Sequence, residues 1–185
     1  VSDYRIGGVT SSGRGGALQG GIDYSWPSGW SAGIWSSTIS LTEGSNVEVD
    51  LYGAKSFDVD NTEFSAGAVL IVLPGGNNAS AGLLTASVST PVGPVDATLA
   101  LRYAWPQGNL DYNDDFYVSV NGKTPIGSVW GSPITLSASI GFERGELAVE
   151  EKKMDWSVSL TANVGGIDIG LSYVDTDLRD ESGAP

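Results

Sequence analysis

The chain has 185 residues, a formal net charge of −13 and neither histidine nor cysteine. A length of this order favours one domain, which we assign to residues 1–185. The acidity excludes nucleic acid as a partner, because binding a phosphate backbone needs basic side chains. The missing residue types exclude a Ser-His-Asp triad, a cysteine nucleophile and a thiolate zinc site, so we expect no enzyme.

Nearly every segment alternates large apolar residues with small or polar ones at a period of two, which is typical of β-strands. One example is ITLSASIGF, at residues 134–142. No segment combines helical periodicity with capping residues. We therefore predict eleven strands, at residues 3–11, 17–26, 30–41, 47–57, 63–73, 83–91, 95–105, 115–124, 133–143, 153–164 and 167–175.

Turn-forming residues separate the predicted strands, in joints of two quite different lengths. PSG (27–29), VDNT (59–62) and GG (165–166) are short, whereas PGGNNASAG (74–82) and PQGNLDYNDD (106–115) are long. Membrane barrels have short turns at one end and long loops at the other. The joints are compatible with that pattern, although short and long ones do not alternate perfectly along the sequence.

The second face of each predicted strand distinguishes the fold classes. A soluble sandwich should present lysine, glutamate and arginine there, but this chain presents mostly Ser, Gly, Ala, Thr and Asn, with its charges concentrated in the predicted loops. That arrangement predicts an all-β, antiparallel up-and-down transmembrane β-barrel, with apolar residues facing lipid. A soluble β-sandwich or a β-rich assembly subunit is the alternative.

Tryptophan and tyrosine recur near the predicted strand ends. Such residues gather at membrane interfaces, because each has an apolar body and a polar tip. We predict interface positions for Trp26, Trp30, Tyr103, Trp105, Trp156 and Tyr173.

The stretch ALQGGIDYSWPSGWSAGIWS (17–36) is predicted to form a hairpin that turns at Pro27-Ser28-Gly29. Its large residues would face lipid and its small ones the interior. Trp35 does not fit this division, because it falls on the small-residue face. It either fills the interior or marks a β-bulge.

Four charged residues fall on the predicted interior face, namely Asp23, Asp50, Arg102 and Asp168. They would set the ion preference of a channel, or form structural ion pairs that plug a narrow interior. Three acidic clusters, at residues 58–63, 111–115 and 175–181, are either solvated loops or calcium sites that bridge molecules. For calcium the best candidates are Asp111, Asn113, Asp114 and Asp115, and we expect no other cofactor.

Residues 2–37 and 47–57 resemble a proteobacterial family of predicted outer-membrane proteins of unknown function, Gcw_chp. The shared features are Ser2-Asp3-Tyr4, a Gln-Gly-Gly strand from Gln19 to Tyr24, a Ser-Gly turn at 28–29, Gly33 to Ser36, and Val49 to Tyr52. The family's arginine before a glycine falls at Gly7 here. Its last strand usually ends in an aromatic residue, whereas this chain ends at Pro185.

The resemblance implies a barrel in the bacterial outer membrane, and it implies no reaction and no ligand. We expect a non-enzymatic, porin-like channel for ions or small solutes, or a structural membrane component. Its partners would be outer-membrane lipid and further copies of itself. The N-terminus VSDYRIGG has no signal-peptide features, so the signal would already be removed.

Eleven strands are an odd number, whereas bacterial single-chain barrels have even numbers. A twelfth strand missing from one terminus would explain this. The second hypothesis is a β-rich assembly subunit that associates through free strand edges, with calcium bridging the copies.

Overall fold

The computed structural model describes residues 1–40, 44–76, 80–148 and 150–178. The chain is all-β, with two short 3-10 helices, η1 (Gly108–Leu110) and η2 (Glu146–Ala148). Its strands are β1 (Arg5–Ile6), β2 (Val9–Thr10), β3 (Gln19–Ser25), β4 (Trp30–Thr38), β5 (Val47–Val59), β6 (Thr62–Val72), β7 (Ser80–Val92), β8 (Val95–Ala104), β9 (Asp115–Val129), β10 (Ser132–Gly145), β11 (Lys152–Val164) and β12 (Ile167–Thr176). Among the described residues, no helix is long and apolar enough to cross a membrane.

Strands β3 to β12 form one antiparallel sheet in which every strand pairs with its neighbours in sequence. Ten of the eleven predicted strands correspond to these ten. The prediction of a single strand at residues 3–11 is wrong, because Gly7 and Gly8 adopt positive φ angles of 52° and 81° and fold this segment into the β1–β2 hairpin.

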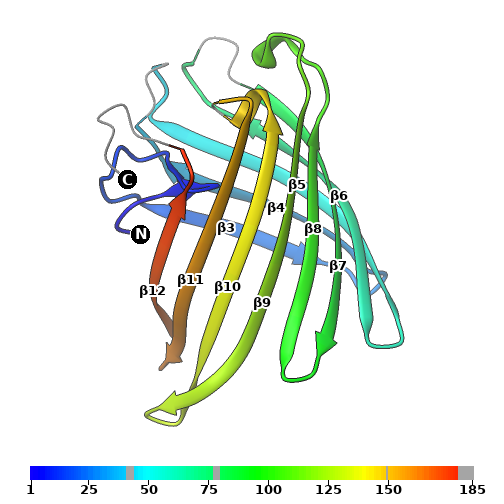
Figure 1. Ribbon diagram of the computed structural model, residues 1–185, viewed down its shortest axis with the longest axis vertical. Helices are drawn as coiled ribbons and strands as arrows, with labels where there is room; N and C mark the ends of the chain where they lie inside the picture. Colours follow the sequence, from blue (N-terminus) through cyan, green and yellow to red (C-terminus); the bar gives the residue numbers. More distant parts are fainter. Residues whose placement is uncertain (41–43, 77–79, 149, 179–185) are drawn as a thin grey trace.

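The sheet curls strongly, as Figure 1 shows, but the described part of it is not closed into a barrel. Strands β3 and β12 are its two edges, and no described residue of one pairs with the other. The predicted hairpin at 17–36 is confirmed, with Trp26 N–H donating to Trp30 O at 2.8 Å and Gly29 at φ 83° in the turn.

All of the short turns lie at one end of the curled sheet, and the long connections lie at the other (Figure 1). The turn end carries the connections after β3, β5, β7, β9 and β11. The loop end carries the N-terminal residues 1–18, η1, η2 and the end of β12. Short and long joints therefore alternate strictly along the chain, which corrects the prediction that their alternation is imperfect.

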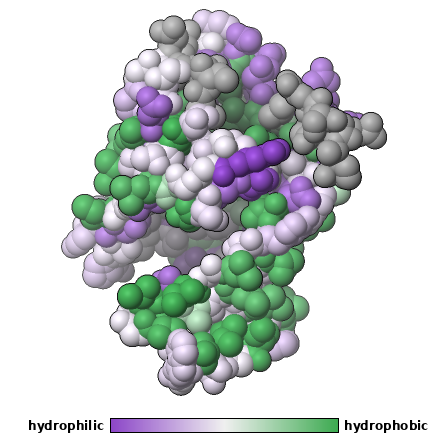
Figure 2. Space-filling view, turned by 90° about the vertical axis from the view of Figure 1, so that its left-hand side faces the viewer, coloured by the Kyte–Doolittle hydropathy of each residue, from purple (hydrophilic) through white to green (hydrophobic). Residues whose placement is uncertain are grey.

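The two faces of the sheet differ sharply. The convex face carries large apolar side chains that are well exposed, such as Ile22 (75%), Val120 (53%), Ile140 (52%) and Leu171 (75%). Figure 2 shows hydrophobic residues gathered over the lower part of one side of the molecule. The concave face carries mainly Ser, Thr, Gly and Ala. A small apolar core of Leu83, Ala104 and Leu110 lies at the loop end.

Many charged residues of the strands lie on the concave face, which corrects the prediction that charge is concentrated in the loops. The strand register places ten acidic and three basic residues there, namely Asp23, Glu48, Asp50, Asp58, Glu63, Asp96, Asp115, Glu143, Asp155 and Asp168 with Arg102, Lys123 and Lys153. The interior is therefore strongly acidic.

Candidate functional site

Two of the most deeply buried charges of the concave face, Glu143 and Lys153, belong to an ion triad near the loop end. Glu143 of β10 pairs with two bases, Arg102 of β8 and Lys153 of β11. The Lys153 Nζ lies 2.6 Å from Glu143 Oε2, and Arg102 Nη2 donates to the other carboxylate oxygen. Glu143 and Lys153 are only 1% and 2% exposed, so their charges need each other inside the protein.

Further polar groups surround this triad. Tyr117 of β9 donates to Asp155 Oδ1 at 3.2 Å, and its ring lies 4.9 Å from the Arg102 guanidinium carbon. Asp115 accepts a hydrogen bond from the backbone of Leu147 at 3.1 Å. The second carboxylate oxygens of Asp115 and Asp155 and the Nε of Arg102 are buried without a partner among the described residues. We call Arg102, Asp115, Tyr117, Glu143, Lys153 and Asp155 the interior cluster.

The four predicted interior charges all lie on the concave face, but they are not brought together. Arg102 belongs to the interior cluster. Asp50 lies further round the sheet, and its Oδ1 is buried without a partner among the described residues. Asp23 accepts a hydrogen bond from Tyr52, and Asp168 accepts one from Asn163 at 2.8 Å near the turn after β11.

The N-terminal segment, residues 1–18, lies between the two edges of the sheet. On one side the Tyr4 hydroxyl donates to Glu48 Oε1 at 2.9 Å, and the Tyr4 ring packs against Trp35 at 5.3 Å between centroids. On the other side, a Cβ added to Gly8 would lie 2.6 Å from Thr176 Cβ. The segment therefore contacts β4 and β5 as well as the end of β12.

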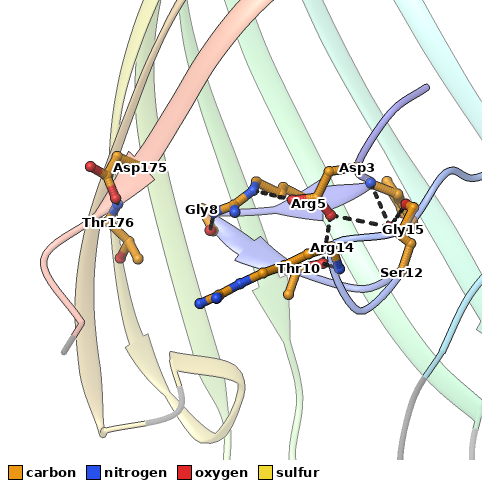
Figure 3. A network of polar contacts seen from close by, with 10 residues as sticks. Asp3, Arg5, Gly8, Thr10, Ser12, Arg14, Gly15, Asp175 and Thr176 are labelled. Carbon is orange, nitrogen blue, oxygen red and sulfur yellow. Dashed lines mark hydrogen bonds and ion pairs between the residues drawn. The ribbon is translucent and has the colours of Figure 1, made fainter. Parts of the chain in front are cut away.

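Asp3 organises this segment internally (Figure 3). Its carboxylate accepts hydrogen bonds from Arg5 Nε at 2.7 Å, from Thr10 at 2.6 Å and from Ser12 at 3.1 Å. Burial raises the pKa of Asp3, but the three hydrogen bonds and the Arg5 charge outweigh it and hold the pKa below its usual value. Burial, followed by the charge of Glu48, raises the pKa of Tyr4, which stays a neutral donor.

Trp35 has a clear position. The register of β4 with β3 and β5 is continuous, so the strand has no bulge there. The side chain fills the interior against Tyr4. Of the two alternatives left by the sequence, the structure selects the first.

The predicted calcium ligands do not form a cluster. Asp115 is turned into the interior, where it is 1% exposed, and Asn113 donates to Glu146 at 3.1 Å. Nowhere in the described ranges does a group of three or more acidic residues lie close enough to share a metal ion. The acidic stretch at 175–181 lies only partly within those ranges.

The predicted interface aromatics lie on the convex face, toward both ends of the strands. Trp26 and Trp30 flank the turn after β3 and are 44% and 56% exposed. Tyr103 and Trp105 lie at the loop end of β8, and Trp156 and Tyr173 lie in the loop-end halves of β11 and β12.

The sequence did not assign Glu143, Lys153, Tyr117 or Tyr4 to the interior. Lys153 and Asp155 alternate with apolar residues at the start of a predicted strand, so the period of two was a usable signal for them. The pairing of Arg102 with Glu143 had no such signal, because 41 residues separate them.

Comparison with known proteins places the chain in a family. A search of curated proteins and a search of solved structures found no match. The family model described as "Bacterial protein of unknown function (Gcw_chp)" matches residues 1–183, nearly the whole chain. The chain therefore belongs to the Gcw_chp family of bacterial proteins.

Proposed function

We propose that the protein is a bacterial outer-membrane β-barrel without enzymatic activity, which acts as a passive channel for small solutes or ions or as a structural membrane component. One observation carries this proposal, namely the apolar convex face. Every strand from β3 to β12 exposes large apolar residues on this face. Strand β6 exposes one, Leu70, and β7 exposes two, Leu84 and Val92.

Lipid is the environment that suits this face. Exposed apolar patches on soluble monomers rarely exceed a few hundred Å². An acidic, hydroxyl-rich concave face beneath an apolar convex face matches the composition of membrane barrels, whose interiors are polar. Membrane barrels also have short turns at one end and long loops at the other, and this sheet has the same arrangement.

The concave face also limits what could pass. Near the loop end its side chains pack tightly, with Glu143, Lys153 and Leu83 between 1% and 3% exposed. Toward the turn end, Asp58, Asp96 and other charges are exposed. A passage through this interior would admit small solutes only.

A gel experiment tests the proposal. Purified protein is run in SDS with and without boiling, after refolding in detergent or in plain buffer. A membrane barrel needs detergent, and unboiled it migrates faster. Solubility to high concentration in buffer alone would refute the membrane location.

Planar-bilayer recordings then separate a channel from a structural component, because a structural component gives no unitary currents.

The edges β3 and β12, which pair with no further strand in the described part of the chain, favour a second candidate, a subunit that self-associates through strand pairing. Unpaired strand edges are templates for such pairing. Oligomers that persist in buffer and dissociate when residues of β12 are replaced by proline would support this candidate over the first.

A further inference from the structure

The concave face has a cavity of about 330 Å³ beside Arg102. Its walls include Ser65 of β6, Thr85 and Ser87 of β7, Arg102 of β8 and Tyr117 of β9. Strand register makes these residues neighbours, since Ser65 lies opposite Ser87, Thr85 opposite Arg102, and Arg102 opposite Tyr117. The volume falls at the lower end of the range of small-molecule pockets, about 300–1,000 Å³.

Three side-chain hydroxyls line this cavity. Some hydroxyls elsewhere on the concave face pair across strands, as Ser89 does with Thr98 at 2.9 Å and Ser139 with Ser157 at 2.7 Å. The side-chain hydroxyls of Ser65, Thr85 and Ser87 make no hydrogen bond with any residue that the structure describes. Each can therefore donate to a ligand and accept from it.

Arg102 supplies a fixed donor at the same place. Its Nη2 is held by Glu143, and its guanidinium lies over the Tyr117 ring. Its Nε is buried and has no partner among the described residues. Because an unpaired buried N–H costs free energy, an acceptor from a bound solute would stabilise this site.

Charge indicates which class of solute fits. The positive charge of Arg102 is paired with Glu143, so the cavity has no free cation to attract an anion. Apart from Arg102 and Glu143, the concave face carries nine acidic and two basic residues, and this negative charge repels anions. Three hydroxyls and one N–H suit a ligand that both donates and accepts hydrogen bonds without being charged.

We propose that this cavity binds a small, uncharged polyhydroxylated solute, a sugar or a polyol. Ser65, Thr85, Ser87 and Arg102 bind its hydroxyls, and Ala100 provides an apolar part of the wall. Transport of this solute rests on the proposed channel function, whereas binding does not.

Binding is measured by calorimetry on the full chain folded in detergent, with D-glucose as the probe and sodium phosphate as the anionic comparison. The test variant combines Ser65→Ala, Thr85→Val and Ser87→Ala. We expect the wild type to bind glucose and not phosphate, and the variant to bind glucose about tenfold or more weakly. Ser159→Ala is the matched control, because Ser159 lies on the concave face but pairs with Ser172, and it should leave binding unchanged.

Binding of phosphate in place of glucose would overturn the solute class, and no glucose binding, or equal binding by the test variant, would overturn the site. If the triple variant does not fold, Thr85→Val alone, which preserves the side-chain shape, should still weaken binding. Glucose binding without unitary currents would refute the channel and leave the site standing. Unitary currents without glucose binding would refute the site and leave the channel standing.

Discussion

At the scale of single residues, Glu143 supplies the counter-charge to two bases, the buried Lys153 and the partly exposed Arg102. It lies between Arg102 and Lys153 and is 1% exposed. Removing one member of a buried ion pair leaves an uncompensated charge, which typically destabilises a protein by about 3–5 kcal/mol.

We therefore predict that Glu143→Gln lowers the free energy of unfolding by about 3–5 kcal/mol, measured by urea unfolding in detergent with tryptophan fluorescence. Glu150→Gln is the control, since Glu150 is exposed, and it should change stability by less than about 0.5 kcal/mol. Equal effects of the two substitutions would show that the triad does not stabilise the fold.

Asp3 predicts a pH dependence for the N-terminal segment. Its hydrogen bonds hold the pKa below its usual value, so the docked segment binds a proton more weakly than the undocked one. The contribution of Asp3 to docking is complete above the unfolded pKa of about 3.9 and is lost as the pH falls through the lower folded value.

Hydrogen exchange of residues 1–16 should thus be slow at neutral pH, after correction for the intrinsic exchange rate, and faster in acid. In Asp3→Asn this acid-dependent loss of protection should be much smaller, because asparagine does not titrate. Identical pH profiles for the two proteins would contradict the role given to Asp3.

The sequence identified individual residues only when the strand period placed them. Arg102, Asp50, Asp23 and Asp168 were assigned to the interior because they alternate with large apolar neighbours. Glu143 pairs with Lys153 through the register of β10 with β11, and with Arg102 through the position of β8 in the sheet, neither of which the period of two specifies.

At the scale of elements, the N-terminal segment holds the two edges of the sheet in relation to each other. Gly8 is the position where it meets β12, with φ at 81° and the backbone oxygen of Asp175 only 2.8 Å from where a Cβ would lie. A side chain there is strained by the backbone conformation and also collides with β12.

We predict that Gly8→Val releases the segment, so that trypsin cleaves after Arg14 several times faster while the ten-stranded sheet persists. Gly20→Val is the matched control, because Gly20 has no atom within 4 Å of an added Cβ and should leave the cleavage rate unchanged. Equal rates for wild type and Gly8→Val would mean that the contact does not hold the segment.

The strands themselves were largely predictable, since ten predicted segments correspond to β3–β12 with shifts at their ends. The segment 3–11 was not, because a period of two does not distinguish one strand from a tight hairpin. Two successive glycines at positive φ, Gly7 and Gly8, turn the chain into the β1–β2 hairpin, and hydrogen bonds to Asp3 stabilise the hairpin.

At the scale of the whole molecule, the fold separates its chemistry by face. Large apolar residues occupy the convex face, and hydroxyls and most strand charges occupy the concave one. The sequence predicted the separation of apolar from small polar residues correctly, but it placed most of the charges in the loops. It did not predict whether β3 and β12 pair to close the sheet. Closure depends on contacts between β3, β12 and the N-terminal segment, which strand periodicity does not encode.

The central claim is that the convex face contacts lipid, and the absence of cysteine makes it directly testable. Single cysteines at Leu99, Val120 and Ile140, which are in register on the convex face, are compared with Thr98, Asn121 and Ser139 on the concave face. Each carries a fluorescent label in lipid vesicles. We predict that quenchers attached to lipid act on the first three labels and much less on the other three. Failure of the protein to enter vesicles, or equal quenching of all six labels, would contradict the claim.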